Sequence, residues 1–257
     1  MNLLLVNDDG IDAKGILALL EAAAAHGHHV VVCAPAQQMS AASQRITLEG
    51  PIMVQQRQLA GAAQAFAISG TPTDCVRLAA RGLAEGPVDV CLSGINNGYN
   101  AGMATYYSGT VGAAREAAMN GYAAMAVSIS HRASDAALKH FADMCIRMAE
   151  GYAALQVPRM TVLNVNAPHV EPEQMDRVVE APLSTANYHD VYERNETPRC
   201  GTAYWLGNDS QSDPATPGSD WDMLQKGYVT YSFLGIPQQI TGLENGFITR
   251  AVQDTAR

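Results

Sequence analysis

Positive charge and long apolar runs are scarce in this sequence. Its 257 residues include 16 Lys and Arg against 25 Asp and Glu, which gives a formal net charge of −9. Binding to the phosphates of a nucleic-acid duplex depends on clustered cationic side chains, so this balance argues against such a partner. Apolar runs end before the roughly 18 residues that cross a bilayer. Residues 1–3 contain no basic leader, so we expect a cytoplasmic protein without a membrane partner.

Several catalytic fingerprints are missing as well. No G-x-G-x-x-G follows an apolar run, and neither G-x-x-x-x-G-K-[ST] nor G-x-S-x-G occurs. These absences disfavour a dinucleotide-binding fingerprint, a P-loop and the nucleophile elbow of serine hydrolases.

The cysteines do not form a pairing pattern. They are odd in number and include no C-x-x-C pair: Cys33, Cys75, Cys91, Cys145 and Cys200. Because free cysteine behaves as a small buried hydrophobe, we expect reduced thiols in the core rather than disulfides or a zinc site.

Short apolar runs alternate with Ala-rich helical stretches in the first half of the chain, an order typical of a mostly parallel sheet. The predicted fold is α/β, a Rossmann-like mostly parallel sheet with helices on both faces and an irregular β-rich C-terminal extension. The predicted domains are residues 1–167, which form the catalytic part, and residues 168–257, which serve oligomerisation. We expect strands at 3–6, 29–33, 88–92, 124–129, 160–165 and 228–233, extended segments at 46–54 and 66–68, a loop at 93–108, and helices at 15–25, 111–120 and 135–151.

A further helix is predicted to begin after Thr71. Thr71 is a suitable N-cap, Pro72 is tolerated at the first helical position, and Asp74 places an acid in the first turn.

Two adjacent carboxylates follow the first expected strand, in Asn7-Asp8-Asp9-Gly10. Ligands bind outside the carboxyl ends of strands in an open parallel sheet, and Gly10 permits a turn that brings both carboxylates toward one point. At about 4 Å and an effective dielectric near 20, two like charges repel by roughly 4 kcal/mol, which a divalent cation between them would offset. The alternative is that Asp8 and Asp9 only form a turn and cap the next helix.

Three further segments are expected at the same edge of the sheet. Ser40 and Ser43 lie in the loop after the second strand, and residues 93–100 offer Asn carbonyl oxygens that suit a hard cation. Ser108-Gly109-Thr110 opens a helix, whose free N–H groups suit a phosphate. Each segment alone is compatible with a plain loop or an N-cap, but their convergence favours a functional site.

The histidines near residue 27 resemble a metal cluster at first sight. His26, His28 and His29 straddle a helix end and the next strand, at what should be the opposite edge of the sheet. We therefore do not expect them to be metal ligands.

Taken in order, five motifs resemble those of the SurE family, the survival-protein nucleotidases. The motifs are Asn7-Asp8-Asp9-Gly10, the Ser40 loop running into Ile46-Thr47, Gly70-Thr71-Pro72-Thr73-Asp74-Cys75-Val76, Ser93-Gly94-Ile95-Asn96 and Tyr107-Ser108-Gly109-Thr110-Val111. The resemblance implies a Mg²⁺ or Mn²⁺ cofactor and hydrolysis of nucleoside monophosphates to nucleoside and phosphate, the 5′-nucleotidase reaction.

The same resemblance implies roles for individual residues. The implied metal ligands are Asp8, Asp9, Ser40 and Asn96, with Asp8 and Asp9 as the catalytic pair. The implied substrate-binding residues are Asn96, Ser108, Gly109 and Thr110. The sequence departs from the family pattern at Arg45, where many members have a small polar residue, and at Ala104-Thr105, where an Asp-Val pair is expected. We expect these departures to affect substrate preference more than metal binding.

There are two alternatives to an enzymatic function. One is a catalytically altered relative that only binds nucleotides. The other is a phospho-receiver module, which needs an acceptor Asp at the end of its third strand, whereas Asp89 precedes the strand here and Ser93 follows it.

Large aromatic side chains are concentrated in the Pro- and Gly-rich part of the extension. They are Tyr188, Tyr192, Tyr204, Trp205, Trp221, Tyr228 and Tyr231. Because interfaces are enriched in Tyr and Trp, we predict a homodimer or a tetramer in which Pro182 to Phe233 supply much of the contact.

Overall fold

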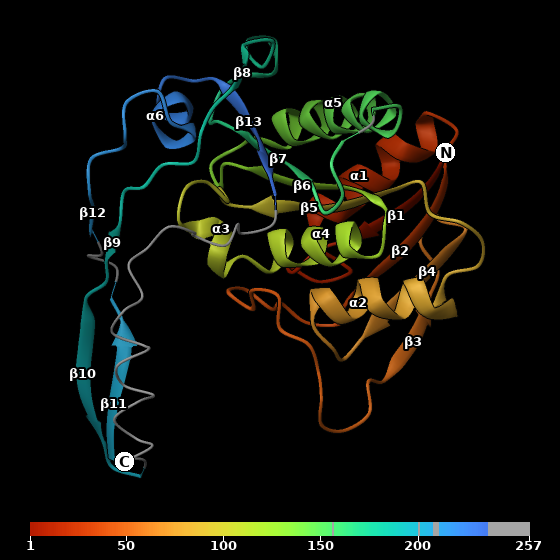
Figure 1. The fold of residues 1–257 in the computed structure, drawn as a ribbon. Coiled ribbons are helices and arrows are strands. Elements are labelled where there is room, and N and C mark those ends of the chain that lie inside the picture. Colours follow the sequence, from red (N-terminus) through yellow and green to blue (C-terminus); the bar gives the residue numbers. More distant parts are fainter. Residues whose placement is uncertain (156, 200, 208–210, 236–257) are drawn as a thin grey trace, which may run out of the picture.

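A sheet of nine strands lies at the centre of the computed structural model, which describes residues 1–155, 157–199, 201–207 and 211–235 (Figure 1). The strand order is β3-β4-β2-β1-β5-β6-β7-β13-β8. The strands are β1 (Asn2–Val6), β2 (His29–Pro35), β3 (Val54–Arg57), β4 (Gln64–Ile68), β5 (Val90–Asn97), β6 (Ala123–Ile129), β7 (Val162–Ala167), β8 (Val178–Glu180) and β13 (Val229–Leu234). Strands β4, β2, β1, β5, β6 and β7 run parallel, which confirms the predicted sheet; β3 and β13 are antiparallel to β4 and β7.

Helices cover both faces of this sheet. They are α1 (Lys14–Ala25), α2 (Pro72–Leu78), α3 (Ala104–Tyr107), α4 (Gly109–Met119), α5 (Asp135–Ala153) and α6 (Asp220–Gln225). Strand β1 shows how the layers form, because side chains alternate along a strand. Leu3 and Leu5 pack in the core that contains α1 and α5, whereas Leu4 and Val6 pack in the core under α2 and α4. The helices therefore bury two separate apolar layers.

Strands from beyond residue 167 complete the sheet, because β13 pairs with β7 and β8 pairs with β13. The rest of the extension forms two small antiparallel pairs, β9 (Tyr188–His189) with β12 (Gln211–Ser212) and β10 (Tyr192–Thr197) with β11 (Gly201–Leu206). The β10–β11 hairpin projects from the main body (Figure 1). Residues 236–257 of the predicted extension lie outside the described residues.

Two of the predicted irregular segments differ in the structure. Residues 93–108 are not one loop, because β5 continues to Asn97 and α3 forms at Ala104–Tyr107. Strand β5 continues past Gly94 because its pairing register with β6 shifts between Ser93 and Asn96. Such a shift accommodates extra residues in one strand without ending the pairing. The extended segment predicted at 46–54 is wrong as well, since a strand begins only at Val54.

The four described cysteines are buried and free, as predicted: Cys33, Cys75, Cys91 and Cys145. Cys200 lies outside the described residues. In the described part of the chain, no helix combines the length and apolar character needed to cross a membrane.

Candidate active site

A tight turn at the carboxyl end of β1 places the two adjacent carboxylates. The Asn7 side chain is buried, and its amide nitrogen donates to the Gly10 carbonyl at 2.7 Å. The Gly10 N–H donates back to Asn7 Oδ1 at 3.2 Å. Gly10 has a φ of 103°, a conformation that glycine adopts without steric cost. Asn7 and Gly10 therefore shape the turn that carries Asp8 and Asp9.

Asp8 is almost completely buried, with 4% of its surface exposed. The Thr110 hydroxyl donates to its Oδ1 at 2.6 Å. Burial raises the pKa of Asp8 to about 6; the Thr110 hydrogen bond opposes this shift and the charge of Asp9 adds to it. A Cβ atom on Gly109 would lie 3.0 Å from Asp8 Cβ, so the start of α4 packs directly against this carboxylate. A positive charge close to Asp8 would therefore favour its ionised form.

Asp9 is tied to the end of the neighbouring strand. Its Oδ2 accepts a hydrogen bond from the Asn97 N–H at 3.1 Å, which connects the β1 turn to β5. Burial raises the pKa of Asp9 as well. Both carboxylates of the pair thus lie where water alone stabilises their charge poorly.

One cavity, with a volume of about 240 Å³, brings the predicted metal ligands together. Its lining includes Asp8, Asp9, Ser40 and Asn96, with Ser108 beside them. The Met39 N–H donates to the Asp8 carbonyl at 2.7 Å, which holds the Ser40 loop against the β1 turn.

The donor atoms in this cavity fit a hard divalent cation. The Asn96 amide nitrogen donates to the Gly98 carbonyl at 2.8 Å, which leaves Asn96 Oδ1 to act as a ligand. Two carboxylates, an amide carbonyl and a hydroxyl form an all-oxygen set, the type that Mg²⁺ and Mn²⁺ prefer.

The amino end of α4 lies beside the cavity. Ser108, one of the two residues that suit an N-cap here, is the N-cap of α4, and its side chain accepts from the Val111 N–H at 3.1 Å. The Thr110 hydroxyl is engaged by Asp8, so it is not directed at the cavity as a free donor. The first N–H groups of a helix have no partner within the helix. Gly109 is the first residue of α4 and is not among the residues that line the cavity.

The Ser40 loop is held in place by α4 and by the residues just before it. Ser43 donates its N–H to the Tyr107 carbonyl at 2.9 Å and its hydroxyl to the Tyr106 carbonyl at 2.7 Å. A Cβ atom on Gly112 would lie 2.3 Å from the Ser43 carbonyl oxygen. Ser43 therefore anchors the loop, and Gly112 is required for the close approach.

The Thr71 motif anchors the next part of the same loop. Thr71 and Asp74 form a capping box at the start of α2, as predicted. The Thr71 hydroxyl also donates to the Arg45 carbonyl at 2.6 Å, and the Thr47 hydroxyl donates to Asp74 Oδ2 at 2.7 Å. This motif connects a helix cap to the loop that carries Ser40. Arg45 itself is exposed and does not line the cavity.

A buried polar network that no sequence motif predicted lies beside the cavity. Asn100, a lining residue, donates its N–H to Asn166 Oδ1 at 2.8 Å and accepts from the Asn164 amide nitrogen at 2.9 Å. Asp220 accepts from the Gly102 N–H at 2.7 Å, and burial raises the pKa of Asp220. The sequence does contain a sign of this network, since the apolar β7 run has asparagines at alternate positions. Such positions lie on the same face of a strand.

The remaining sequence candidates lie in different places. Ala104 lines the cavity, whereas the Thr105 hydroxyl donates to the Gly102 carbonyl at 2.8 Å. Asp89 lies at the opposite end of the sheet, where it accepts from the Asn2 N–H at 2.7 Å. The acceptor aspartate of a phospho-receiver module would lie beside Asp8 and Asp9, and Asp89 does not.

Known proteins resemble this chain in sequence and in fold. The family model described as "Survival protein SurE" matches residues 3–190. The chain is 36% identical over 230 residues to the 5'-nucleotidase SurE of Maridesulfovibrio salexigens, covering 90% of this chain and 91% of that protein. It is 38% identical over 237 residues to the protein of the same name from Desulfovibrio desulfuricans, covering 90% and 91%. The crystal structure of the SurE protein from Aquifex aeolicus superposes with a TM-score of 0.75 at 28% identity, covering 100% of both chains.

Proposed function

The chain belongs to the SurE family, and on this premise we propose that it is a metal-dependent phosphomonoesterase that hydrolyses nucleoside 5′-monophosphates to nucleoside and phosphate. The observation that carries the proposal is that two carboxylates, a hydroxyl and an amide line the same cavity, beside the start of α4. The relatives named 5'-nucleotidase support the choice of substrate.

Asp8, Asp9, Ser40 and Asn96 are the proposed ligands of Mg²⁺ or Mn²⁺. When bound, such a cation neutralises charge on a phosphate oxygen and lowers the pKa of a coordinated water. The buried Asp8–Asp9 pair supports this assignment, because burial raises the pKa of both carboxyl groups and an adjacent cation would reverse that shift.

Ser108 and Gly109 are the proposed phosphate contacts, together with Asn96. Ser108 accepts from the Val111 N–H, so its own O–H proton remains to be donated to a phosphate oxygen. The Gly109 N–H adds a main-chain donor at the positive end of the α4 dipole. That Thr110 also contacts the phosphate stays a prediction; its hydroxyl bond to Asp8 supports a positioning role instead.

The Asp8–Asp9 pair is proposed to accept the proton of the attacking water. The Thr110 hydroxyl donates to one oxygen of Asp8, and the Asn97 N–H donates to one oxygen of Asp9. The second oxygen of each carboxylate is left for the cavity.

Phosphate release from a panel of 5′- and 3′-nucleoside monophosphates tests the proposal. We expect hydrolysis with Mg²⁺ or Mn²⁺, loss of activity in excess chelator, and recovery on adding the metal back. Full activity in chelator would refute the metal site, and binding of nucleotides without turnover under any metal would refute the enzyme.

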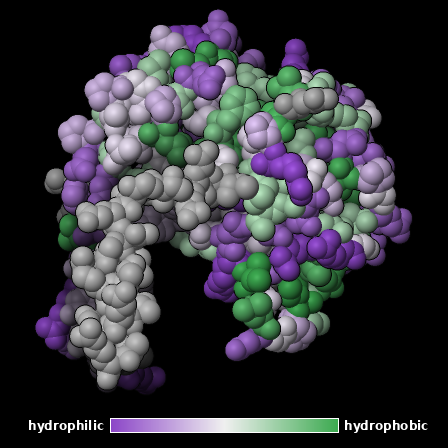
Figure 2. All heavy atoms as spheres, in the orientation of Figure 1, coloured by the Kyte–Doolittle hydropathy of each residue, from purple (hydrophilic) through white to green (hydrophobic). Residues whose placement is uncertain are grey.

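We also propose a homodimer or tetramer that forms through Pro182 to Phe233. Support comes from the β10–β11 hairpin, where Tyr192, Tyr204 and Trp205 have 60%, 63% and 66% of their surface exposed. A second exposed apolar area covers the loop before β3, where Leu48 and Met53 are 84% and 66% exposed (Figure 2).

Light scattering tests this assembly, because the single chain has a mass of 27.3 kDa. We expect a multiple of that mass, and a smaller species in the double variant Tyr204→Ser, Trp205→Ser. A single-chain mass at micromolar concentration would contradict the proposal. The cytoplasmic location stays a prediction from the sequence.

A further inference from the structure

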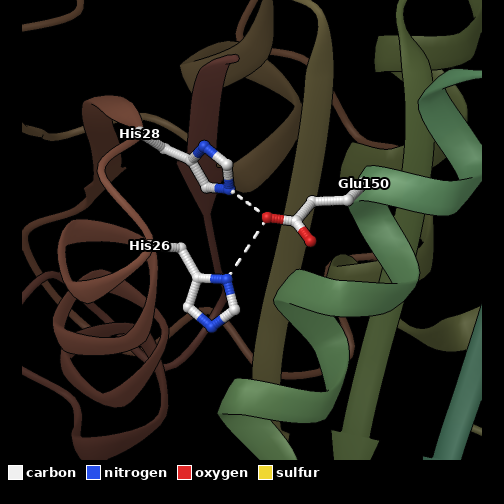
Figure 3. A group of neighbouring side chains, drawn as sticks. All are labelled: His26, His28 and Glu150. Atoms are coloured by element: carbon white, nitrogen blue, oxygen red, sulfur yellow. Dashed lines mark hydrogen bonds and ion pairs between the residues drawn. The ribbon is translucent and has the colours of Figure 1, made fainter.

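Two histidines and a glutamate converge at the amino end of the sheet. His26 follows α1, His28 precedes β2, and Glu150 comes from α5 (Figure 3). His26 Nδ1, His28 Nε2 and a Glu150 carboxylate oxygen all lie within 4.8 Å of one another. Glu150 Oε1 lies 3.2 Å from the His26 nitrogen and 3.1 Å from the His28 nitrogen. Three potential ligand atoms thus face one point.

We propose that His26, His28 and Glu150 form a second metal site, selective for a transition-metal dication of the Zn²⁺ class. Two imidazoles and one carboxylate are a ligand set that zinc uses, with water in the fourth position. Zinc bonds to such ligands at about 2.0–2.2 Å, which places tetrahedral ligand atoms roughly 3.4 Å apart. The two separations of 3.1 Å and 3.2 Å from Glu150 would widen by a few tenths of an ångström, and the two imidazole nitrogens, which lie within 4.8 Å of each other, would adjust to the same spacing.

The outer partner of His26 suits metal binding. His26 Nε2 lies 2.9 Å from Asp143 Oδ1, and the Arg147 Nε donates to the other Asp143 oxygen at 2.9 Å. A carboxylate on the far nitrogen fixes the tautomer and leaves Nδ1 unprotonated toward the metal. His28 Nδ1 lies 3.4 Å from the Met1 ammonium nitrogen, which donates to it, so zinc binding at His28 Nε2 would displace the proton that Nε2 shares with Glu150.

Burial gives the site a defined geometry. The side chain of His28 is 8% exposed and that of His26 is 22% exposed, whereas Glu150 at 42% leaves the site open to solvent. The two packed imidazoles lose little further freedom when they bind a metal, which lowers the entropic cost of binding. The neighbouring His29 is exposed and is not among the three ligands.

This site is distinct from the candidate active site. Met1 contacts His28 at one end of β1, and Asp8 follows its other end, so β1 separates the two by roughly 16 Å at 3.3 Å per residue. The oxygen-only cavity suits Mg²⁺, whereas imidazole nitrogens favour Zn²⁺. The metal would tie the turn between α1 and β2 to α5, which is a structural role.

Zinc titration of untagged protein tests the proposal, by competition with a chromophoric chelator at about pH 8.5. This pH is chosen because hydrogen bonds to Asp143 and Glu150 raise the pKa of His26. Excess Mg²⁺ is included so that it occupies the oxygen ligands of the candidate active site and zinc does not bind there. We expect one Zn²⁺ per chain in the wild type, and the same in the matched control His29→Gln. His26→Gln and His28→Gln should lose this binding, and Asp143→Asn should weaken it by about 10–100-fold.

Thermal unfolding provides a second readout that does not depend on activity. Added Zn²⁺ should raise the unfolding midpoint of the wild type and of His29→Gln, but not of His28→Gln, because only a ligand bound to the folded state stabilises it. If His26→Gln or His28→Gln does not fold, Glu150→Gln and Asp143→Asn carry the test. Absence of Zn²⁺ binding in the wild type, or equal binding in the cluster variants and His29→Gln, would overturn the proposal and leave an ion-pair network only.

Discussion

The affinity of the candidate active site for a divalent cation should depend strongly on pH through Asp8. Burial raises the pKa of this carboxyl group from 3.8 to about 6 in the metal-free protein. That shift corresponds to about 3 kcal/mol at 1.36 kcal/mol per unit. Because the folded-state pKa is raised, neutral Asp8 favours the metal-free fold below pH 3.8, and that contribution disappears as the pH rises through about 6. A bound cation offsets the cost of ionisation.

The magnitude follows from proton competition. With a pKa of about 6, Asp8 is about 97% ionised at pH 7.5 but only about 9% ionised at pH 5. The metal requires the ionised form, so lowering the pH over this range should weaken metal affinity by about tenfold from Asp8 alone. Burial also raises the pKa of Asp9, which acts in the same direction.

Titration with Mn²⁺, followed by electron paramagnetic resonance of the free ion, measures this dependence. The matched variant Asp8→Asn should bind more weakly at about pH 7.5, and its affinity should change less on acidification because the titrating group is gone. Equal Mn²⁺ affinity of the wild type at both ends of this range would refute the assignment of a buried Asp8 as ligand.

Three further substitutions test individual contacts. Asp9→Asn should lower metal affinity or turnover at least about tenfold with the fold intact by circular dichroism; near-normal values for both would contradict its role as ligand. Thr110→Val removes the hydrogen bond that lowers the pKa of Asp8, so the midpoint of the Mn²⁺ affinity profile should move to higher pH, and an unchanged midpoint would speak against this contact. Thr71→Ala removes a helix cap and should lower the free energy of unfolding in urea by about 1 kcal/mol. Thr73→Val is its control, because the buried Thr73 hydroxyl has no partner among the described residues, and an equal loss in both variants would contradict the capping argument.

Local patterns in the sequence were sufficient for much of the fold. The apolar run Leu3 to Val6 predicted a buried parallel strand because both of its faces pack under helices. Thr71 and Asp74 predicted a helix start because both capping bonds join residues three apart. Asp8 and Asp9 were placed correctly at the carboxyl end of β1, since strand order and chain direction alone determine that position.

Other features depend on contacts between residues that are distant in the chain. Thr110 bonds to Asp8 across 102 positions, and His26 meets Glu150 across 124. Hydropathy and propensity describe the environment of a residue but not the identity of its partner. The sequence therefore determined the parallel strands of the sheet, the helix cap at Thr71 and the edge of the sheet that carries the candidate active site. Tertiary packing decided which polar groups meet, because a buried polar group is paired by whichever element the fold brings within hydrogen-bond distance.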